Sequence, residues 1–470
     1  MPLVDAPAKR NGLLGPELAW IVSRKVEAGI GAAFPEGLRQ DSPSVGHPSI
    51  RRPQSGGLTG STNPHSQAMR NVILTVFLTS VSPALAQQFV VDGNGGPSAH
   101  FTDITAAVAA VPDGSTLLVR AGVYAPVLIA NKAITILCDA GVSANSGPSN
   151  GPFLEVRDTQ PHAPVAVFNL HRAVPQFTSS VGGISIRNAT GPVTIDGSGQ
   201  VYAMPEAKVA LTIQDATQVS IRRIQLTGSP GVRVENAQVV FESCDLRGRW
   251  GATTFFASPA QLGILAIDSE LQLVHSSASG GNGSTTTFPF FLFTPPESAV
   301  QLTNSQLRMT GDASHELRGG NDPQTGIHIA SLTGSGNATA RIAPAITIVG
   351  PVAASVAVAT PQMPSLRSAP TAPGQALSVE RGSTTGSVSI LALSVRSLGV
   401  LSIGQDPLWL DPISYVVVDI AVTPANGMVP FAFTVPNEPL LRGFQVVWQG
   451  VDLRPGSNLA LSNPSPSFVR

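Results

Sequence analysis

The sequence is poor in charged side chains, which make up 12% of its 470 residues and leave a formal net charge of −1. Beyond residue 70 the only lysines are Lys132 and Lys208. A surface that binds nucleic acid without sequence preference needs clustered Lys and Arg, because these side chains displace the counterions of the phosphates. No long basic or acidic run occurs, so we expect no nucleic-acid partner.

Aromatic residues are also scarce, at 5% of the chain. Their scarcity counts against a conventional carbohydrate cleft, in which sugar rings lie on flat aromatic side chains. Glycine and proline are abundant, with 46 and 40 residues, and 42% of the chain is hydrophobic. Together with many Val, Ile, Ser and Thr residues, this composition predicts short strands joined by tight turns.

Residues 69–86 have the pattern of a secretory signal peptide. Arg70 supplies the positive region, residues 72–81 are apolar, and residues 84–86 (Ala-Leu-Ala) form a cleavage site before Gln87. The apolar run is too short to span a bilayer. We interpret residues 1–68 as a disordered or spurious N-terminal extension. We expect an exported protein, secreted or at the cell surface, with no membrane span after signal removal.

Residues 88–137 show strand, turn and helix signals in a clear order. A short strand is followed by the turn residues of VDGNGG, and apolar residues then recur at helical spacing over 101–111, with Thr102 as the predicted N-cap. The run Pro-Asp-Gly at 112–114 ends this helix. Further strands are predicted at 117–119, 127–129 and 134–136.

Three stretches of residues 88–137 resemble the N-terminal segment of the pectin-lyase-like right-handed parallel β-helix superfamily. Their sequences are VDGNGG, FTDITAAVAAVPDGSTLLVRAGVY and ITIL. In that superfamily the helix covers the open end of the first coil, where apolar side chains and strand edges would otherwise be exposed. The resemblance implies an all-β fold, a right-handed parallel β-helix over residues 87–349 with an N-terminal capping helix. It implies no particular chemistry, because one fold hosts many functions.

An internal repeat supports stacked coils. Five pairs of short strands each turn at an Asp or Asn, which tolerates left-handed backbone geometry. These residues form a predicted structural Asx ladder: Asn188, Asp215, Asn236, Asp268 and Asn304. Their spacings are 27, 21, 32 and 36 residues, and the longer ones indicate inserted loops. Because three of the five are Asn, a structural role is favoured over a metal-binding row of carboxylates.

The two cysteines, Cys138 and Cys244, lie 106 residues apart. Coils that stack at about 4.8 Å would separate them by several coils. A disulfide spans only about 6 Å between Cα atoms. We therefore favour two separate buried thiols over a bridge.

The end of the chain differs in composition from the coils. Residues 350–376 are rich in Ala, Pro and Ser and are predicted to be a linker. Residues 377–470 contain strands broken by Pro and Gly, which predicts a small antiparallel β-sandwich. This segment resembles a C-terminal module of exported multidomain bacterial proteins. Trp409 and Trp448 are expected in its core.

Polar residues are concentrated in one part of the repeat. Cross-strand ion pairs on a solvated face would explain them. Alternatively, they bind an acidic sugar through bidentate Arg contacts and Trp stacking. The candidate ligand-binding residues are Arg222, Glu242, Asp245, Arg247, Arg249 and Trp250. The histidines His275, His315 and His328 are far apart in the sequence, and no metal site is predicted from them.

No catalytic residues follow from the family resemblance. The sequence words that mark the catalytic sites of polygalacturonases, pectinesterases and pectate lyases are absent. We therefore expect a β-helix protein that binds polysaccharide or serves as a surface or structural module. The alternative is a lyase or hydrolase of acidic polysaccharide with a non-standard site. No cofactor is expected, and Ca²⁺ is implied only for a lyase. The oligomeric state stays open.

Overall fold

The computed structural model describes residues 87–145, 151–173, 183–202, 209–253, 257–286, 292–395, 397–403, 406–411, 415–454 and 459–470. All of them belong to one compact unit, Asn63–Arg470. The predicted N-terminal extension and signal peptide lie outside the described residues. No described helix combines the length and hydrophobicity that a membrane span requires.

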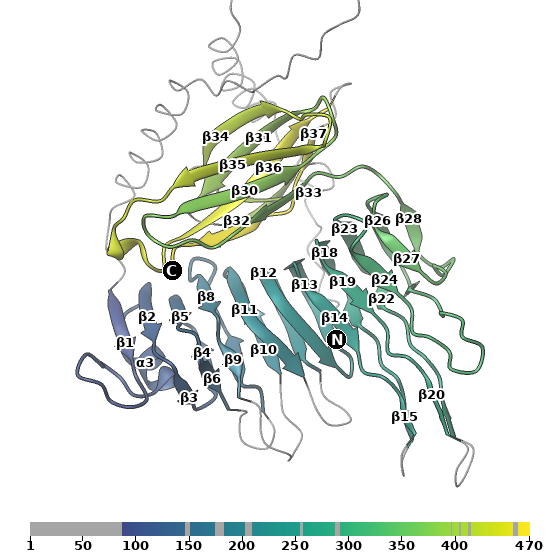
Figure 1. The fold of residues 1–470 in the computed structure, drawn as a ribbon, viewed down its shortest axis with the longest axis horizontal. Helices are drawn as coiled ribbons and strands as arrows, with labels where there is room; N and C mark the ends of the chain where they lie inside the picture. Colours follow the sequence, from purple (N-terminus) through teal and green to yellow (C-terminus); the bar gives the residue numbers. More distant parts are fainter. Residues whose placement is uncertain are drawn as a thin grey trace, which may run out of the picture. The chain divides into compact units, whose positions relative to one another are not determined.

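The chain from β1 to β28 forms a parallel β-helix, seen in Figure 1 as a row of strands that follow one another in sequence order. Its strands are β1 (Gln88–Val91), β2 (Ser115–Val119), β3 (Gly122–Tyr124), β4 (Val127–Ala130), β5 (Ile134–Cys138), β6 (Val142–Ala144), β7 (Leu154–Arg157), β8 (Val165–Phe168), β9 (His171–Arg172), β10 (Ile184–Ala189), β11 (Val193–Tyr202), β12 (Leu211–Gly228), β13 (Val232–Glu242), β14 (Asp245–Gly248), β17 (Ile264–Ile267), β18 (Glu270–Val274), β19 (Ser277–Ser279), β22 (Val300–Thr303), β23 (Gln306–Thr310), β24 (Glu316–Arg318), β25 (Leu332–Ser335), β26 (Thr339–Ile342), β27 (Thr347–Val349) and β28 (Ala357–Ala359).

Parallel pairing divides these strands into three faces. The first face runs β4, β7, β10, β12, β13, β17, β22, β25. The second face runs β1, β2, β5, β8, β11, β12, β13, β18, β23, β26, β28. The third face includes the ends of β11 and β12 and then β14, β19, β24, β27. The predicted all-β class with a parallel β-helix is confirmed.

Inward side chains of successive rungs stack into one apolar column. On the first face, six residues occupy equivalent positions and are 0% exposed: Val156, Ile186, Ile213, Val234, Ala266 and Leu302. Burial of each large aliphatic side chain contributes about 1.5–3 kcal/mol. A slip of one residue would turn the whole set outward, so this column fixes the register.

A short helix covers the first coil. The helix α3 (Ile104–Ala110) buries Ile104, Ala107 and Val108 against the core of the first rungs. Its N-cap is Asp103, whose Oδ1 accepts a 2.8 Å hydrogen bond from the backbone N–H of Ala106. The capping helix therefore forms where it was predicted, but the N-cap is one residue later than Thr102. A carboxylate oxygen at this position satisfies a free N–H of the first turn.

The five predicted Asx residues lie at equivalent turns between the first and second faces. Their φ angles range from 47° to 52°, the left-handed region that Asn and Asp tolerate best. Two adjacent pairs are bonded along the row. Asn236 Nδ2 donates to Asp215 Oδ1 over 2.8 Å, and Asn188 Nδ2 donates to Asp158 Oδ1 over 3.1 Å, which extends the row by one rung.

The segment predicted as a linker, 350–376, contains two short strands and the start of a third. It contains β28, which pairs with β26, and β29 (Ser365–Ser368), which pairs antiparallel with β30 (Ala376–Gly382). The Ala- and Pro-rich composition predicts an extended chain. In the structure, parts of this extended chain pair with neighbouring strands. The β-helix therefore continues past 349, and the C-terminal module begins before 377.

The C-terminal module is a pair of antiparallel sheets. One sheet consists of β29, β30 and β35 (Met428–Thr434), and the other of β31 (Val388–Ser394), β34 (Val416–Val422), β36 (Gln445–Leu453), β37 (Leu459–Leu461) and β38 (Ser465–Phe468). A separate hairpin pairs β32 (Ser397–Ile403) with β33 (Asp406–Leu410). Side chains of both larger sheets meet in one core around Trp448, which is 0% exposed. Trp409 is also buried, but it packs against Val240 and Val274 of the β-helix and not in the module's own core.

The second face of the β-helix packs against the C-terminal module. Phe168 meets Phe468 edge-on, with ring centroids 4.0 Å apart, and Trp409 contacts Val240 and Val274. Gln445 Nε2 donates to Thr194 Oγ1 over 3.2 Å. Strands of this face are consequently buried on both sides, one toward the column and one toward the module.

The two cysteines are separate thiols, as favoured from their spacing. Cys244 is 4% exposed, whereas Cys138 is partly exposed. Burial raises the pKa of Cys244 to about 12 and also raises the pKa of Cys138. Neither thiol is therefore ionised at neutral pH.

Candidate functional site

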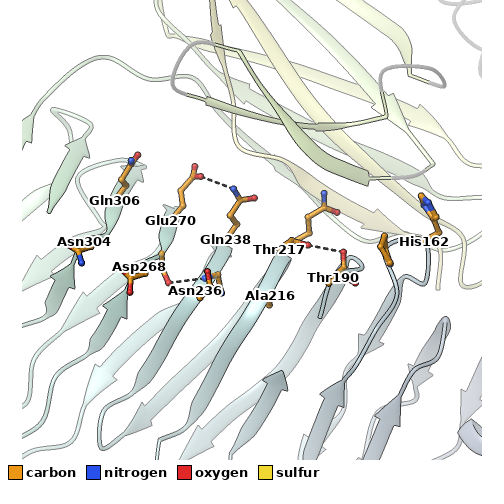
Figure 2. A pocket seen from close by; sticks show the side chains of 14 residues that line it. His162, Thr190, Ala216, Thr217, Asn236, Gln238, Asp268, Glu270, Asn304 and Gln306 are labelled. Atoms are coloured by element: carbon orange, nitrogen blue, oxygen red, sulfur yellow. Dashed lines mark hydrogen bonds between the residues drawn. The ribbon is translucent and has the colours of Figure 1, made fainter. Parts of the chain in front are cut away.

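A groove with a volume of about 760 Å³ follows the Asx turns (Figure 2). We call it the Asx groove. All of its lining residues belong to β-helix rungs: Pro161, His162, Thr190, Ala216, Thr217, Gln218, Asn236, Ala237, Gln238, Asp268, Ser269, Glu270, Asn304 and Gln306. Its size lies within the range of known ligand sites, about 300–1,000 Å³.

Two parallel rows of polar side chains line the groove. The first row consists of ladder residues. The second row is displaced by two residues along each rung, and its side chains project from successive rungs (Figure 2). The second row is Thr190, Thr217, Gln238, Glu270 and Gln306. Pairing of β13, β18 and β23 places Gln238 beside Glu270 and Glu270 beside Gln306. Because strands alternate faces, the residue between the two rows points inward and is small.

These small residues fix the turns. Ser269 Oγ accepts a 3.1 Å bond from the N–H of Ala237 and donates to the carbonyl of Ile267 over 2.6 Å. The N–H of Ser269 donates in turn to Ser305 Oγ over 3.0 Å. Buried serines thus join neighbouring rungs under the groove. The polar rows above them are held in register on regular strands.

Glu270 is the carboxyl group with the most perturbed surroundings in the groove. Burial raises its pKa, whereas a bond from Gln272 and the charge of Arg308 lower it less strongly. Gln238 Nε2 donates to Glu270 Oε2 over 3.4 Å. Asp268 lies two residues earlier on the same rung and is exposed. A half-buried carboxyl group that holds its proton to higher pH is suited to general acid catalysis.

The structure buries two of the predicted ligand-binding residues. Arg222 and Glu242 are 1% and 2% exposed and lie on the second face, under the C-terminal module. Arg222 Nη2 is 2.7 Å from Glu242 Oε1, and Nη1 is 3.4 Å from Asp196 Oδ2. The guanidinium also donates to the carbonyls of Ser368 and Pro466 of the module. These two side chains join the module to the β-helix and are not available to a ligand.

The other four predicted residues lie on or after β14, on the third face. Asp245 is half-buried and paired with Arg247, and it accepts a 3.2 Å bond from Gln225 Nε2. Arg249 is partly buried, and Trp250 is 66% exposed. None of the six predicted residues is among the described residues that line the Asx groove. The ion pairs of the polar segment are thus divided between two faces.

The groove's second row was not predicted, although the sequence carries its signal. Each second-row residue follows a ladder residue by two positions, and all five are outward polar side chains beside a small inward residue. The ladder pattern by itself predicts only turns, whereas the residue two positions after each ladder residue is polar in every rung of the repeat.

The histidines are closer in space than their sequence positions suggested. His275 and His315 lie on neighbouring rungs, with ring centroids 5.2 Å apart at 74°. These two histidines are therefore near each other in space although far apart in the sequence, because Val274 and Thr310, 36 residues apart, are register partners on adjacent rungs. Burial lowers the pKa of His275 to about 4, with smaller contributions from Arg367 and His315.

No protein-family model and no curated protein sequence matches this chain. Among solved structures, it is similar to the enzymatically active domain of tailspike protein 2 of bacteriophage CBA120. That similarity has a TM-score of 0.33 and 10% identity, over 79% of this chain and 73% of the other. The full-length tailspike protein 2 from the Escherichia coli O157:H7 phage gives a TM-score of 0.26 and 9% identity, over 82% and 68%. No residue of either tailspike protein is carried over to this chain.

Proposed function

We propose that this chain binds an extended polysaccharide that lies along the Asx groove. The observation that supports the proposal most strongly is the pair of polar rows held in register on successive rungs. Adjacent rungs are about 4.8 Å apart, so they offer amide, hydroxyl and carboxylate groups at regular intervals. A polymer of sugar rings presents hydroxyl groups at a comparable repeat and can bond to several rungs at once.

The charge of the groove favours a neutral polysaccharide over the acidic one expected from the sequence. Asp268 and Glu270 bring carboxyl groups to the groove, and no Arg or Lys is among its described lining residues. A uronate would meet like charge there without a bidentate cation to offset it. Recognition would instead use Asn236, Gln238 and Gln306, whose amides both donate and accept hydrogen bonds.

A second candidate function is hydrolysis of the bound chain. The specific observation is the raised pKa of Glu270 in the groove, together with a second carboxyl group at Asp268. Glycoside hydrolases use one protonated carboxylic acid to protonate the leaving oxygen and one carboxylate as base or nucleophile. In this scheme Glu270 is the proton donor and Asp268 is the second group.

Binding is tested with the full chain and a panel of neutral and acidic polysaccharides in affinity electrophoresis. We expect retardation by a neutral polymer, and at least a tenfold weaker interaction for the double variant Gln238→Ala, Gln306→Ala. Gln214→Ala, a side chain on the first face outside the groove, is the matched control and should bind as the parent does. Equal retardation of all three proteins, or no retardation by any polymer, would refute the proposal.

Hydrolysis is tested by reducing-end release from the polymers that bind. If the second candidate is correct, Glu270→Gln loses most of the release while polymer retention persists. Retention with no new reducing ends in the parent would leave binding as the function. We also propose that the protein is exported, as its signal pattern predicts. A mature chain beginning at Gln87, measured by intact mass, would support this.

A further inference from the structure

Three side chains with metal-binding chemistry meet at one turn of the β-helix, away from the lining residues of the Asx groove. His275 directly follows β18, and Asp312 and His315 follow β23 on the next rung. Val274 and Thr310 are register partners at the ends of these strands, and the N–H of His275 donates to the carbonyl of Thr310 over 2.8 Å. Regular strand pairing therefore fixes the approach of the three side chains.

The distances within this cluster suit a single ion. The ligand atoms of His275, Asp312 and His315 all lie within 4.8 Å of one another. His315 Nδ1 is 3.0 Å from Asp312 Oδ1. Bonds of about 2.0–2.2 Å from a metal to nitrogen and oxygen ligands require only small side-chain rotations from this arrangement.

One atom of the cluster has no partner. Nδ1 of His275 is buried and makes no hydrogen bond to any described atom. A buried polar atom without a partner destabilises the folded state, and a bound ion is one accepted explanation for such an atom. The backbone of His275 has a φ of 46°, in the left-handed region, where His is enriched together with Asn and Asp among residues other than Gly.

We propose that His275, Asp312 and His315 bind one divalent transition-metal ion of the zinc class. Two imidazoles and one carboxylate form the ligand set of many zinc sites that keep an open position for water. Calcium and magnesium are disfavoured because they prefer several oxygen ligands, and only one carboxylate is present. The three proposed ligands are not among the residues that line the Asx groove, so this proposal does not depend on the proposed polysaccharide binding.

Neighbouring groups support the ligands. The backbone N–H of Ser314 donates to Asp312 Oδ1 over 2.9 Å, which orients the carboxylate as an outer partner does in known sites. The charge of Arg367 of β29 acts on His275, and Arg367 is itself paired with Glu380 of β30. The ion would therefore not face an uncompensated positive charge. Bound there, it would cross-link two rungs.

The test is a zinc titration of the full chain against a chromophoric competitor, with nickel and calcium in parallel. We expect one zinc ion per chain and a melting temperature that rises with zinc concentration, because an ion that binds only the folded state stabilises it. His315→Ala and Asp312→Asn should each weaken zinc binding at least tenfold. His328→Ala is the matched control, since His328 lies outside the cluster and its Nδ1 is 2.7 Å from the carbonyl of Gly319.

Cobalt separates loss of the site from loss of the fold. Co²⁺ bound by the parent should show visible d–d absorption bands that zinc abolishes. Asp312→Asn changes an exposed side chain and should keep the parent's circular dichroism while losing those bands. Absence of zinc binding in the parent, or equal binding by the parent and both ligand variants, would overturn the proposal.

Discussion

Arg222 Nη2 lies 2.7 Å from Glu242 Oε1, and both side chains are almost completely buried between the β-helix and the C-terminal module. Ser465 of β38 completes the arrangement by donating to Glu242 Oε2 over 2.8 Å. The guanidinium of Arg222 and the carboxylate of Glu242 are thus both shielded from water. Such a pair adds little net stability as a whole, but the loss of one partner leaves the other charge buried and uncompensated.

Arg222→Met should destabilise the protein by about 3–5 kcal/mol, because Glu242 and Asp196 would be left without their buried cation. The free energy of unfolding from urea denaturation measures this loss. Arg233→Met is the control, since Arg233 pairs with Glu235 on the surface with 45% of its side chain exposed. An exposed pair contributes about 0–1 kcal/mol. Equal losses in the two variants would show that Arg222 is not buried as described.

Glu270→Gln should change how stability depends on pH. Burial raises the pKa of Glu270 in the folded state, so between the unfolded value of about 4.3 and the raised value the folded state binds more protons. The contribution of Glu270 is therefore present at low pH and lost as pH rises through the folded pKa. Relative to the parent, the Gln variant should gain stability as the pH rises above the unfolded-state pKa of about 4.3. Parallel curves for the two proteins would contradict the raised pKa.

Asn236→Val should destabilise the chain by about 1–2 kcal/mol, because a β-branched side chain fits poorly at a φ of 47°. Asn236→Gly is the matched control. It loses the same hydrogen bond to Asp215 but accepts left-handed geometry without a steric cost. Thermal or urea denaturation of both variants separates the backbone effect from the hydrogen bond. If valine is tolerated as well as glycine, the left-handed turn is not needed at this rung.

Cys244 should resist alkylation in the native protein. Its thiol is buried, and its pKa of about 12 leaves almost no thiolate at pH 8. Iodoacetamide treatment followed by mass spectrometry should show no native adduct in a Cys138→Ser variant and one adduct after unfolding in guanidinium. Rapid native labelling of that variant would place Cys244 on an accessible surface.

Much of the fold can be predicted from the sequence because the inward-facing apolar residues recur at equivalent positions of each rung. Ile186, Ile213 and Val234 recur before Asx residues at equivalent turns, and local patterning alone aligns them. The N-terminal cap is similarly local. The course of 350–376 could not be predicted, because composition does not tell an extended linker from an extended strand that finds a partner.

The candidate site was harder to predict because the outward positions show no comparable recurrence of residue types in the sequence. Arg222 and Trp250 both follow the pattern of surface residues, yet one is 1% and the other 66% exposed. The difference depends on whether the C-terminal module covers that face, and this is a contact between distant parts of the chain. The Asx groove and the histidine cluster are different, since rung alignment brings Gln238 beside Glu270 and His275 near His315.

Hydrogen bonds between the second face of the β-helix and the C-terminal module couple the unfolding of these two parts. Arg308 of β23 pairs with Asp406 of β33 over 3.0 Å and donates to carbonyls of Pro364 and Leu461 over 3.0 and 2.7 Å. Detaching the module would break these ionic hydrogen bonds and would expose the apolar contacts of Phe168 and Trp409 to water. A chain truncated after the β-helix should therefore fold poorly. Heating the intact protein should unfold the β-helix and the C-terminal module in a single cooperative transition.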